Sequence, residues 1–118
     1  MKYMLLIYSA EDAGPEPGSS EFEAQMGKWF SVSNEMAEAG VMLAGAPLQG
    51  LESASTVRIR DGKRLVTDGP FAETKEILGG YYLLDCAGLD EALSWAAKLS
   101  NAPYGSVEVR PIQEYPGM

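Results

Sequence analysis

The chain of 118 residues carries 9 Lys or Arg and 17 Asp or Glu and no histidine, so its formal charge is −8. This charge opposes binding to nucleic acid, and the lack of histidine excludes histidine-ligated metal sites and histidine-dependent catalytic triads. Length and the 46% apolar content predict a single globular domain over residues 1–118. The longest apolar run, residues 3–8, is too short for a membrane span, and no signal peptide is evident, so we expect a cytoplasmic protein without a membrane partner.

The N-terminal third predicts a strand, a loop and a helix. Residues 2–8 are apolar on both alternating faces, which is typical of a central strand covered on both sides. Residues 9–18 are acidic and rich in Pro and Gly, and they predict a loop that is either mobile or borders the pocket entrance. A helix should begin at Ser20, which has capping-box spacing to Glu23, and end at Gly40. Its expected apolar stripe comprises Phe22, Met26, Trp29, Phe30, Met36 and Ala37.

The middle of the chain predicts a short strand and a hairpin. Residues 41–46 are apolar, and Pro47 limits their hydrogen bonding, so we expect an edge strand. Residues 56–60 and 63–67 alternate in polarity on either side of Asp61-Gly62, the signature of a tight β-hairpin.

The C-terminal half predicts a strand, a helix and a last strand. Pro70 is suited to begin one helical turn, and residues 77–86 form a strand in which Gly79-Gly80 marks a bulge. A second helix capped at Gly88 precedes the strand at residues 106–112. Its expected stripe is Leu89, Ala92, Leu93, Ala96 and Leu99.

This order of elements predicts an α+β, ferredoxin-like split β-α-β fold with one extra hairpin strand, in which both helices cover one face of the sheet. The strands at residues 2–8 and 77–86 have apolar residues on both faces, so the helix-free face should meet a second copy of the chain. We therefore expect a homodimer, which Leu6→Asp or Leu84→Asp should disrupt, with a ligand cavity between the two sheets.

A specific motif supports this interpretation. Residues 67–76 read TDGPFAETKE, and Leu78-Gly79-Gly80-Tyr81-Tyr82 follows. The chain closely resembles the YCII-related, or DGPF-domain, family of small bacterial proteins, a likeness that extends to residues 1–8, 91–98 and 107–112.

The resemblance implies a dimeric α+β barrel in which two ferredoxin-like subunits pack sheet to sheet. Family members are often encoded beside extracytoplasmic-function sigma factors, so association with a sigma factor follows from the resemblance alone. The histidine–aspartate dyad suggested for the broader group does not carry over, because this chain has no histidine.

Asp68 is the candidate catalytic residue, and two roles for it stay open. It can cap the amides that follow Pro70, or its carboxylate can face the cavity as a general base. The candidate ligand-binding residues are Tyr8, Arg58, Tyr81 and Arg110. The arginines suit an anion clamp or an ion-pair ladder beside Glu108, and the tyrosines suit ligand contact or plain core packing.

We expect a homodimer that binds a small molecule bearing a carbonyl or carboxylate, with possible acid/base chemistry. The alternatives are a non-catalytic sensor or accessory protein working with a sigma factor, and a purely structural dimer with a filled interface. No nucleotide-binding or metal-binding motif occurs, so no cofactor and no metal is expected. Cys86 is most simply a small buried hydrophobe.

Overall fold

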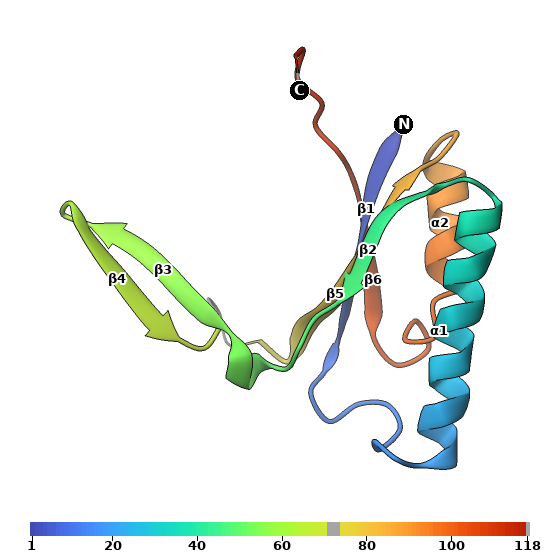
Figure 1. Cartoon of the computed structure of the whole chain (residues 1–118), viewed down its shortest axis with the longest axis horizontal. Helices are drawn as coiled ribbons and strands as arrows, with labels where there is room; N and C mark the ends of the chain where they lie inside the picture. Colours follow the sequence, from blue (N-terminus) through green and yellow to red (C-terminus); the bar gives the residue numbers. More distant parts are fainter. Residues whose placement is uncertain (71–73, 118) are drawn as a thin grey trace.

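The computed structural model describes residues 1–70 and 74–117 and has a mixed α+β architecture. Its main sheet is antiparallel, with strand order β2-β5-β1-β6. These strands are β1 (Lys2–Ala10), β2 (Met42–Pro47), β5 (Glu76–Asp85) and β6 (Ser106–Pro111). Helices α1 (Ser20–Glu38) and α2 (Leu89–Ala97) both lie on one side of this sheet (Figure 1). The β-α-β-β-α-β order of the ferredoxin-like prediction is thus present.

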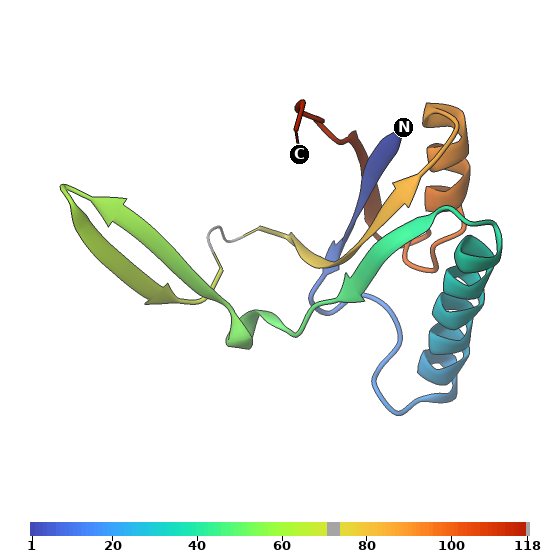
Figure 2. The ribbon, with the colours of Figure 1, turned by 45° about the horizontal axis from the view of Figure 1, so that its top comes forward.

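The predicted hairpin is present but does not join the main sheet. Strands β3 (Ser55–Arg60) and β4 (Lys63–Asp68) form a separate two-stranded sheet, which projects away on the side opposite the helices (Figures 1 and 2). The turn has the positive φ values, 52° at Asp61 and 73° at Gly62, that an Asp-Gly hairpin turn requires. We call residues 55–68 the arm and the rest of the described chain the body.

The prediction of an extra strand in the sheet is wrong because the chain turns away after β2. Leu48 N donates to Gly79 O at 2.8 Å, the last such bond along β2 and β5, and the short 3₁₀ helix η1 (Leu51–Ser53) follows. At the base of the arm, Gly69 N donates to Ala54 O at 2.7 Å, and Thr56 Oγ1 donates to Gly69 O at 2.8 Å. These bonds hold the two ends of the arm together.

The core lies between the helices and the sheet. Its fully buried side chains include Leu5, Met36, Leu84 and Leu99. In α1 the expected stripe is partly wrong: Val32 and Met36 are buried, whereas the Phe30 side chain is 65% exposed and Met26 is also exposed. The reason is that Met26 and Phe30 border a cavity instead of closing onto the sheet.

The expected stripe of α2 is also only partly right. Ala92, Ala96 and Leu99 are buried, but Leu89 and Leu93 are each 48% exposed. The small alanines bring one face of the helix against the sheet, so the neighbouring leucines lie outside the contact.

The helix starts depend on local hydrogen bonds. Ser19, one residue before the predicted position, caps α1, because its Oγ accepts from Phe22 N at 3.1 Å. Before α2, where Gly88 has no side chain, Glu91 Oε1 accepts from Ala87 N at 2.8 Å.

The helix-free face of the sheet carries apolar side chains along β1 and β5. The register pairs Met4 with Leu83, Leu6 with Tyr81 and Tyr8 with Leu78, and paired residues project to the same face. A register shift at Ile7/Tyr8 accommodates one extra residue in β5, as the paired glycines predicted.

Leu6 therefore lies on the helix-free face, but the choice of Leu84 as a second interface position is wrong. Leu84 is fully buried beneath the helices.

No described helix is both long enough and apolar enough to cross a lipid bilayer.

Candidate functional site

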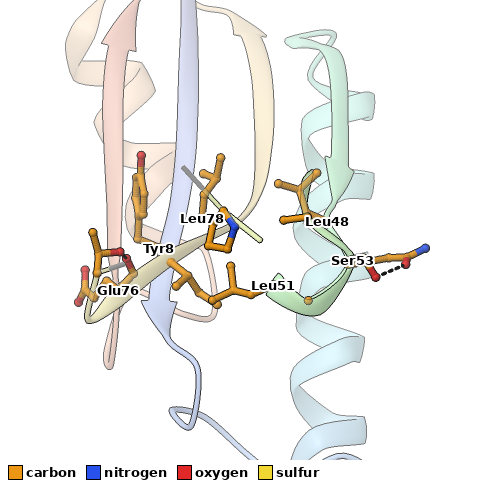
Figure 3. A pocket seen from close by; sticks show the side chains of 12 residues that line it. Tyr8, Leu48, Leu51, Ser53, Glu76 and Leu78 are labelled. Carbon is orange, nitrogen blue, oxygen red and sulfur yellow. Dashed lines mark hydrogen bonds between the residues drawn. The ribbon is translucent and has the colours of Figure 1, made fainter. Parts of the chain in front are cut away.

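A cavity of about 720 Å³ lies where the arm leaves the body, between the end of β1 and β5 and the segment that follows β2 (Figure 3). We call it the arm-base cavity. In Figure 3, Tyr8 and Glu76 lie on one side, and Leu48, Leu51 and Ser53 lie on the other. The lining residues are Tyr8, Leu48, Gln49, Gly50, Leu51, Ser53, Ala54, Pro70, Thr74, Glu76, Ile77 and Leu78.

The polar side chains of this cavity come from Tyr8 of β1, from Thr74 and Glu76 at the entry to β5, and from Gln49 and Ser53 across the cavity. Glu76 is half-buried, and its Oε1 accepts from Ser106 Oγ at 3.5 Å. Thr74 Oγ1 donates to the Glu76 carbonyl and so fixes the local backbone. The Glu76 carboxylate can accept hydrogen bonds from a ligand, and the Tyr8 phenol can donate one. Among the described lining residues, Glu76 supplies a carboxylate, and none is Lys or Arg.

Of the five residues proposed from the sequence, only Tyr8 lines this cavity. Asp68 is exposed at the end of β4, where it pairs in register with Ser55 of the arm. The amides that it was expected to cap, after Pro70, and the predicted helical turn both fall at residues 71–73, outside the described residues.

The two arginines lie apart from each other and from the cavity lining. Arg110 donates from Nε and Nη2 to Glu108 Oε2, at 3.1 and 2.6 Å, and this hydrogen bond raises the pKa of the Arg110 guanidinium. The expected ion pair beside Glu108 is therefore present. Arg58 is half-buried in β3 of the arm. The Tyr81 side chain pairs with Leu6 on the helix-free face, and the residue also borders a different cavity.

This second cavity, of about 410 Å³, lies between α1 and the β2–β5 side of the sheet. We call it the helix-side cavity. Ser33 and Tyr82 share a hydrogen bond between their hydroxyls at 2.7 Å inside it. The ring of Tyr82 reaches Ser33 by crossing over Gly45, where a Cβ atom would lie 2.7 Å from Tyr82 Cδ1.

Asn101 is a polar residue at one end of the helix-side cavity and is only 2% exposed. Its Nδ2 donates to the carbonyls of Tyr8, at 3.1 Å, and Ser106, at 3.2 Å. Gly105 makes this arrangement possible, because a Cβ there would lie 2.3 Å from Tyr8 O. The Asn101 Oδ1 atom has no hydrogen-bond partner within the described part of the chain.

Sequence reasoning missed both Glu76 and Asn101. Glu76 is the last residue of the motif at residues 67–76, in which Asp68 was singled out as the candidate carboxylate. Asn101 stands in Asn-Ala-Pro, which is typical of a helix end, so the pattern explained the residue without a site.

Cys86 is buried, as predicted. Burial raises the pKa of its thiol, and Glu91 and Asp85 add to this, so the sulfur has little nucleophilic thiolate at neutral pH. Within residues 1–70 and 74–117, no three or more Cys, Asp or Glu side chains are grouped so that they could hold a metal ion.

Comparison with known proteins places the chain in a family. Residues 1–116 match the YCII-related domain, and the protein belongs to this family. The "Uncharacterized protein R00369" of Rhizobium meliloti (strain 1021) is 45% identical over 117 residues, which cover 98% of this chain and 94% of that protein.

A solved structure supports the fold. The 5-chloro-2-hydroxyhydroquinone dehydrochlorinase TftG from Burkholderia phenoliruptrix AC1100, in complex with 2,5-dihydroxybenzoquinone, superposes with a TM-score of 0.51. The match covers 98% of this chain and 96% of that chain at 13% sequence identity. At this identity the likeness concerns the fold.

Proposed function

We propose that the protein is a homodimer that binds a small organic molecule in the arm-base cavity. The observation that carries the proposal is the lining of this cavity. Pro70, Thr74, Glu76 and Leu78, which belong to the motif of the family resemblance, lie around the same space as Tyr8. A volume of about 720 Å³ is in the range of small-molecule sites.

The apolar helix-free face supports the dimer. Met4, Leu6 and Leu83 lie there without a covering layer from their own chain, and packing against a second sheet would remove them from water. The radius of gyration is 16.4 Å, whereas a compact chain of this length has about 13.5 Å, so the arm extends beyond a single globule.

The distribution of charge supports a second copy as the partner. The arm carries four cations and two carboxylates, a net charge of +2, and the other 104 residues carry five cations and fifteen carboxylates, a net charge of −10. An arm of this charge is attracted to the acidic body of another copy. In a sheet-to-sheet dimer, the arms extend toward the partner subunit, because they project from the helix-free side.

The proposed ligand bears a carbonyl or a carboxylate. Tyr8 donates a hydrogen bond to it, and Glu76 accepts one from a hydroxyl or amine elsewhere on the molecule. Arg58 and Arg110 lie outside the lining of their own chain's cavity, so their expected role in binding an anion depends on the partner subunit. TftG, which shares the fold, was solved with a small carbonyl-bearing ring compound.

Acid/base chemistry at this site would use one carboxylate. Asp68 remains the base proposed from the sequence, and Glu76 is the alternative, because it lies within the cavity. If Asp68 is the base, Asp68→Asn should abolish turnover; if Glu76 is the base, Glu76→Gln should do so, because each substitution removes one proton acceptor.

A thermal-shift screen with small carbonyl and carboxylate metabolites tests the proposal. A bound ligand raises the melting temperature by mass action. We expect Tyr8→Phe and Glu76→Gln to weaken binding about tenfold each, the value of one good hydrogen bond, and Glu38→Gln, an exposed carboxylate on α1, to leave it unchanged. Hits that stabilise all variants equally would exclude the arm-base cavity. Asp68→Asn, assayed on the same hits, tests the proposed base.

A further inference from the structure

We propose that the helix-side cavity is a second binding site, for a small, flat, uncharged ring compound that carries an N–H or O–H donor. The cavity is lined by residues of α1 and of the sheet of one chain, whereas Tyr8 and Leu78 of the arm-base cavity project to the helix-free face. The inference is therefore independent of the proposed dimer and of the ligand proposed above.

The lining of the cavity favours a neutral ligand. Its described lining contains no Asp, Glu, Lys or Arg; its polar side chains are the hydroxyls of Ser9, Ser33, Tyr82 and Tyr104 and the amide of Asn101. Because no opposite charge is present in the lining, a charged ligand would lose its hydration without compensation. The volume of about 410 Å³ suits one or two fused rings.

Aromatic residues favour a flat ligand. Trp29 and Phe30 of α1 lie on one side, and Tyr82 of β5 belongs to the sheet on the other. Aromatic side chains contribute large apolar surfaces and prefer stacked or edge-to-face contacts with another ring. The 65% exposure of Phe30 is consistent with this, because its ring contributes more to the rim of the cavity than to the core.

The buried amide oxygen of Asn101 is the reason for proposing a hydrogen-bond donor on the ligand. A buried amide oxygen without a partner costs about 1–3 kcal/mol, and native proteins have few such atoms. The amide cannot simply be reversed, because Nδ2 already donates to two carbonyls, of Tyr8 and Ser106. Oδ1 is itself closed off from solvent, so a ligand N–H or O–H would satisfy this acceptor once the end of the cavity at Asn101 opens on binding. The Ser33–Tyr82 pair retains one hydroxyl proton for a second bond to the ligand.

Indole and 1-methylindole are matched probes for this inference. Both are neutral and flat, and only indole has an N–H donor. Titration of protein with ¹³C-labelled methionine methyl groups reports the location, because Met26 and Met42 line the helix-side cavity, whereas Met4 lies on the helix-free face. We expect indole to shift the Met26 and Met42 signals and to leave Met4 unchanged, and 1-methylindole to bind about tenfold more weakly.

Two variants complete the test. Phe30→Ala should weaken indole binding about fivefold, the value of one aromatic contact, while Leu93→Ala, an equally accessible truncation on α2, should not change it. The inference is wrong if millimolar indole leaves Met26 and Met42 unshifted, if the two probes bind equally, or if Phe30→Ala has no effect. Shifts confined to Met4 would also overturn it and would favour a ligand on the helix-free face.

Discussion

The body and the arm are stabilised in different ways. In the body, a sheet and two helices enclose a set of fully buried side chains, including Leu5, Met36 and Leu84. The arm has no such interior: every residue of β4 is exposed, as are Val57 and Ile59 of β3. An isolated two-stranded hairpin is marginally stable in water. The body can therefore fold on the strength of its own core, whereas the arm depends on a surface outside its own sheet.

The largest expected effect is a difference in unfolding free energy between matched leucine truncations in the body and in the arm. Leu5→Ala removes a side chain that is 0% exposed and should lower the free energy of unfolding by about 2–5 kcal/mol. Leu65→Ala in the arm, where the leucine is 47% exposed, should change it by about 0.5 kcal/mol or less in a monomeric background. Urea denaturation monitored by circular dichroism measures both. A comparable loss for Leu65→Ala would mean that the arm is part of the cooperative core.

The second expected effect concerns assembly. Leu6→Asp places a carboxylate on the helix-free face and should convert the proposed dimer to monomer in sedimentation velocity at micromolar concentration, because an unpaired charge cannot be buried in an apolar interface. Glu38→Gln is the control. A dimer that survives Leu6→Asp would place the interface on another face.

Deletion of the arm sharpens the same comparison. The Gly69 N to Ala54 O bond shows that its two ends are adjacent, so a short glycine linker can replace residues 55–68 without straining the body. We expect a truncated protein that still unfolds cooperatively but dimerises at least about tenfold more weakly. Loss of cooperative unfolding would contradict the independence of the body.

Sequence reasoning was most successful for the body. The ferredoxin-like order and the bulge at the paired glycines follow from local patterns in the body, and the Asp-Gly turn follows from one in the arm, so these features could be predicted. The position of the arm could not, because alternation in residues 56–67 describes a hairpin equally well within a sheet or outside one. Likewise, Leu6 and Leu84 both belong to strands that are apolar on both faces, and only the packing of α1 and α2 distinguishes them.

The candidate site was harder to predict, because it is assembled from separate elements. Of the residues proposed, Tyr8 lines the arm-base cavity, whereas the Arg110 guanidinium donates to Glu108 on the same strand. Periodicity cannot reveal that α1 stands off the sheet near Met26 and Phe30 and so leaves the helix-side cavity. Nor can it reveal the buried state of Asn101, which depends on the close approach at Gly105.

A smaller effect tests the polar contact between α1 and the sheet. Tyr82→Phe removes the hydroxyl bond to Ser33 and should cost about 1 kcal/mol of stability, without affecting the arm or the proposed dimer. Ser33→Ala should cost a similar amount, and the double variant little more than either alone, since both remove one bond. Additive losses in the double-mutant cycle would show that the hydroxyls act separately.

The smallest effect is the pH dependence due to Cys86. Burial raises the pKa of its thiol above the ordinary value of 9.0, so the folded chain retains the proton to higher pH than the unfolded chain. Stability from this group is complete below the unfolded pKa and is lost as the pH rises through the folded pKa. Cys86→Ala should therefore reduce the loss of stability in denaturation experiments at alkaline pH, and identical slopes for both proteins would contradict this assignment.

Tyr8 connects the two cavities. Its side chain lines the arm-base cavity, while its carbonyl accepts the hydrogen bond from Asn101 in the helix-side cavity. A ligand bound to Asn101 therefore contacts the side chain that holds the Tyr8 carbonyl, at the point where the register of β1 and β5 shifts. Such coupling is reciprocal, because each ligand would change the affinity for the other by the same factor. Strand β1 would then link binding in two cavities on opposite faces of one sheet.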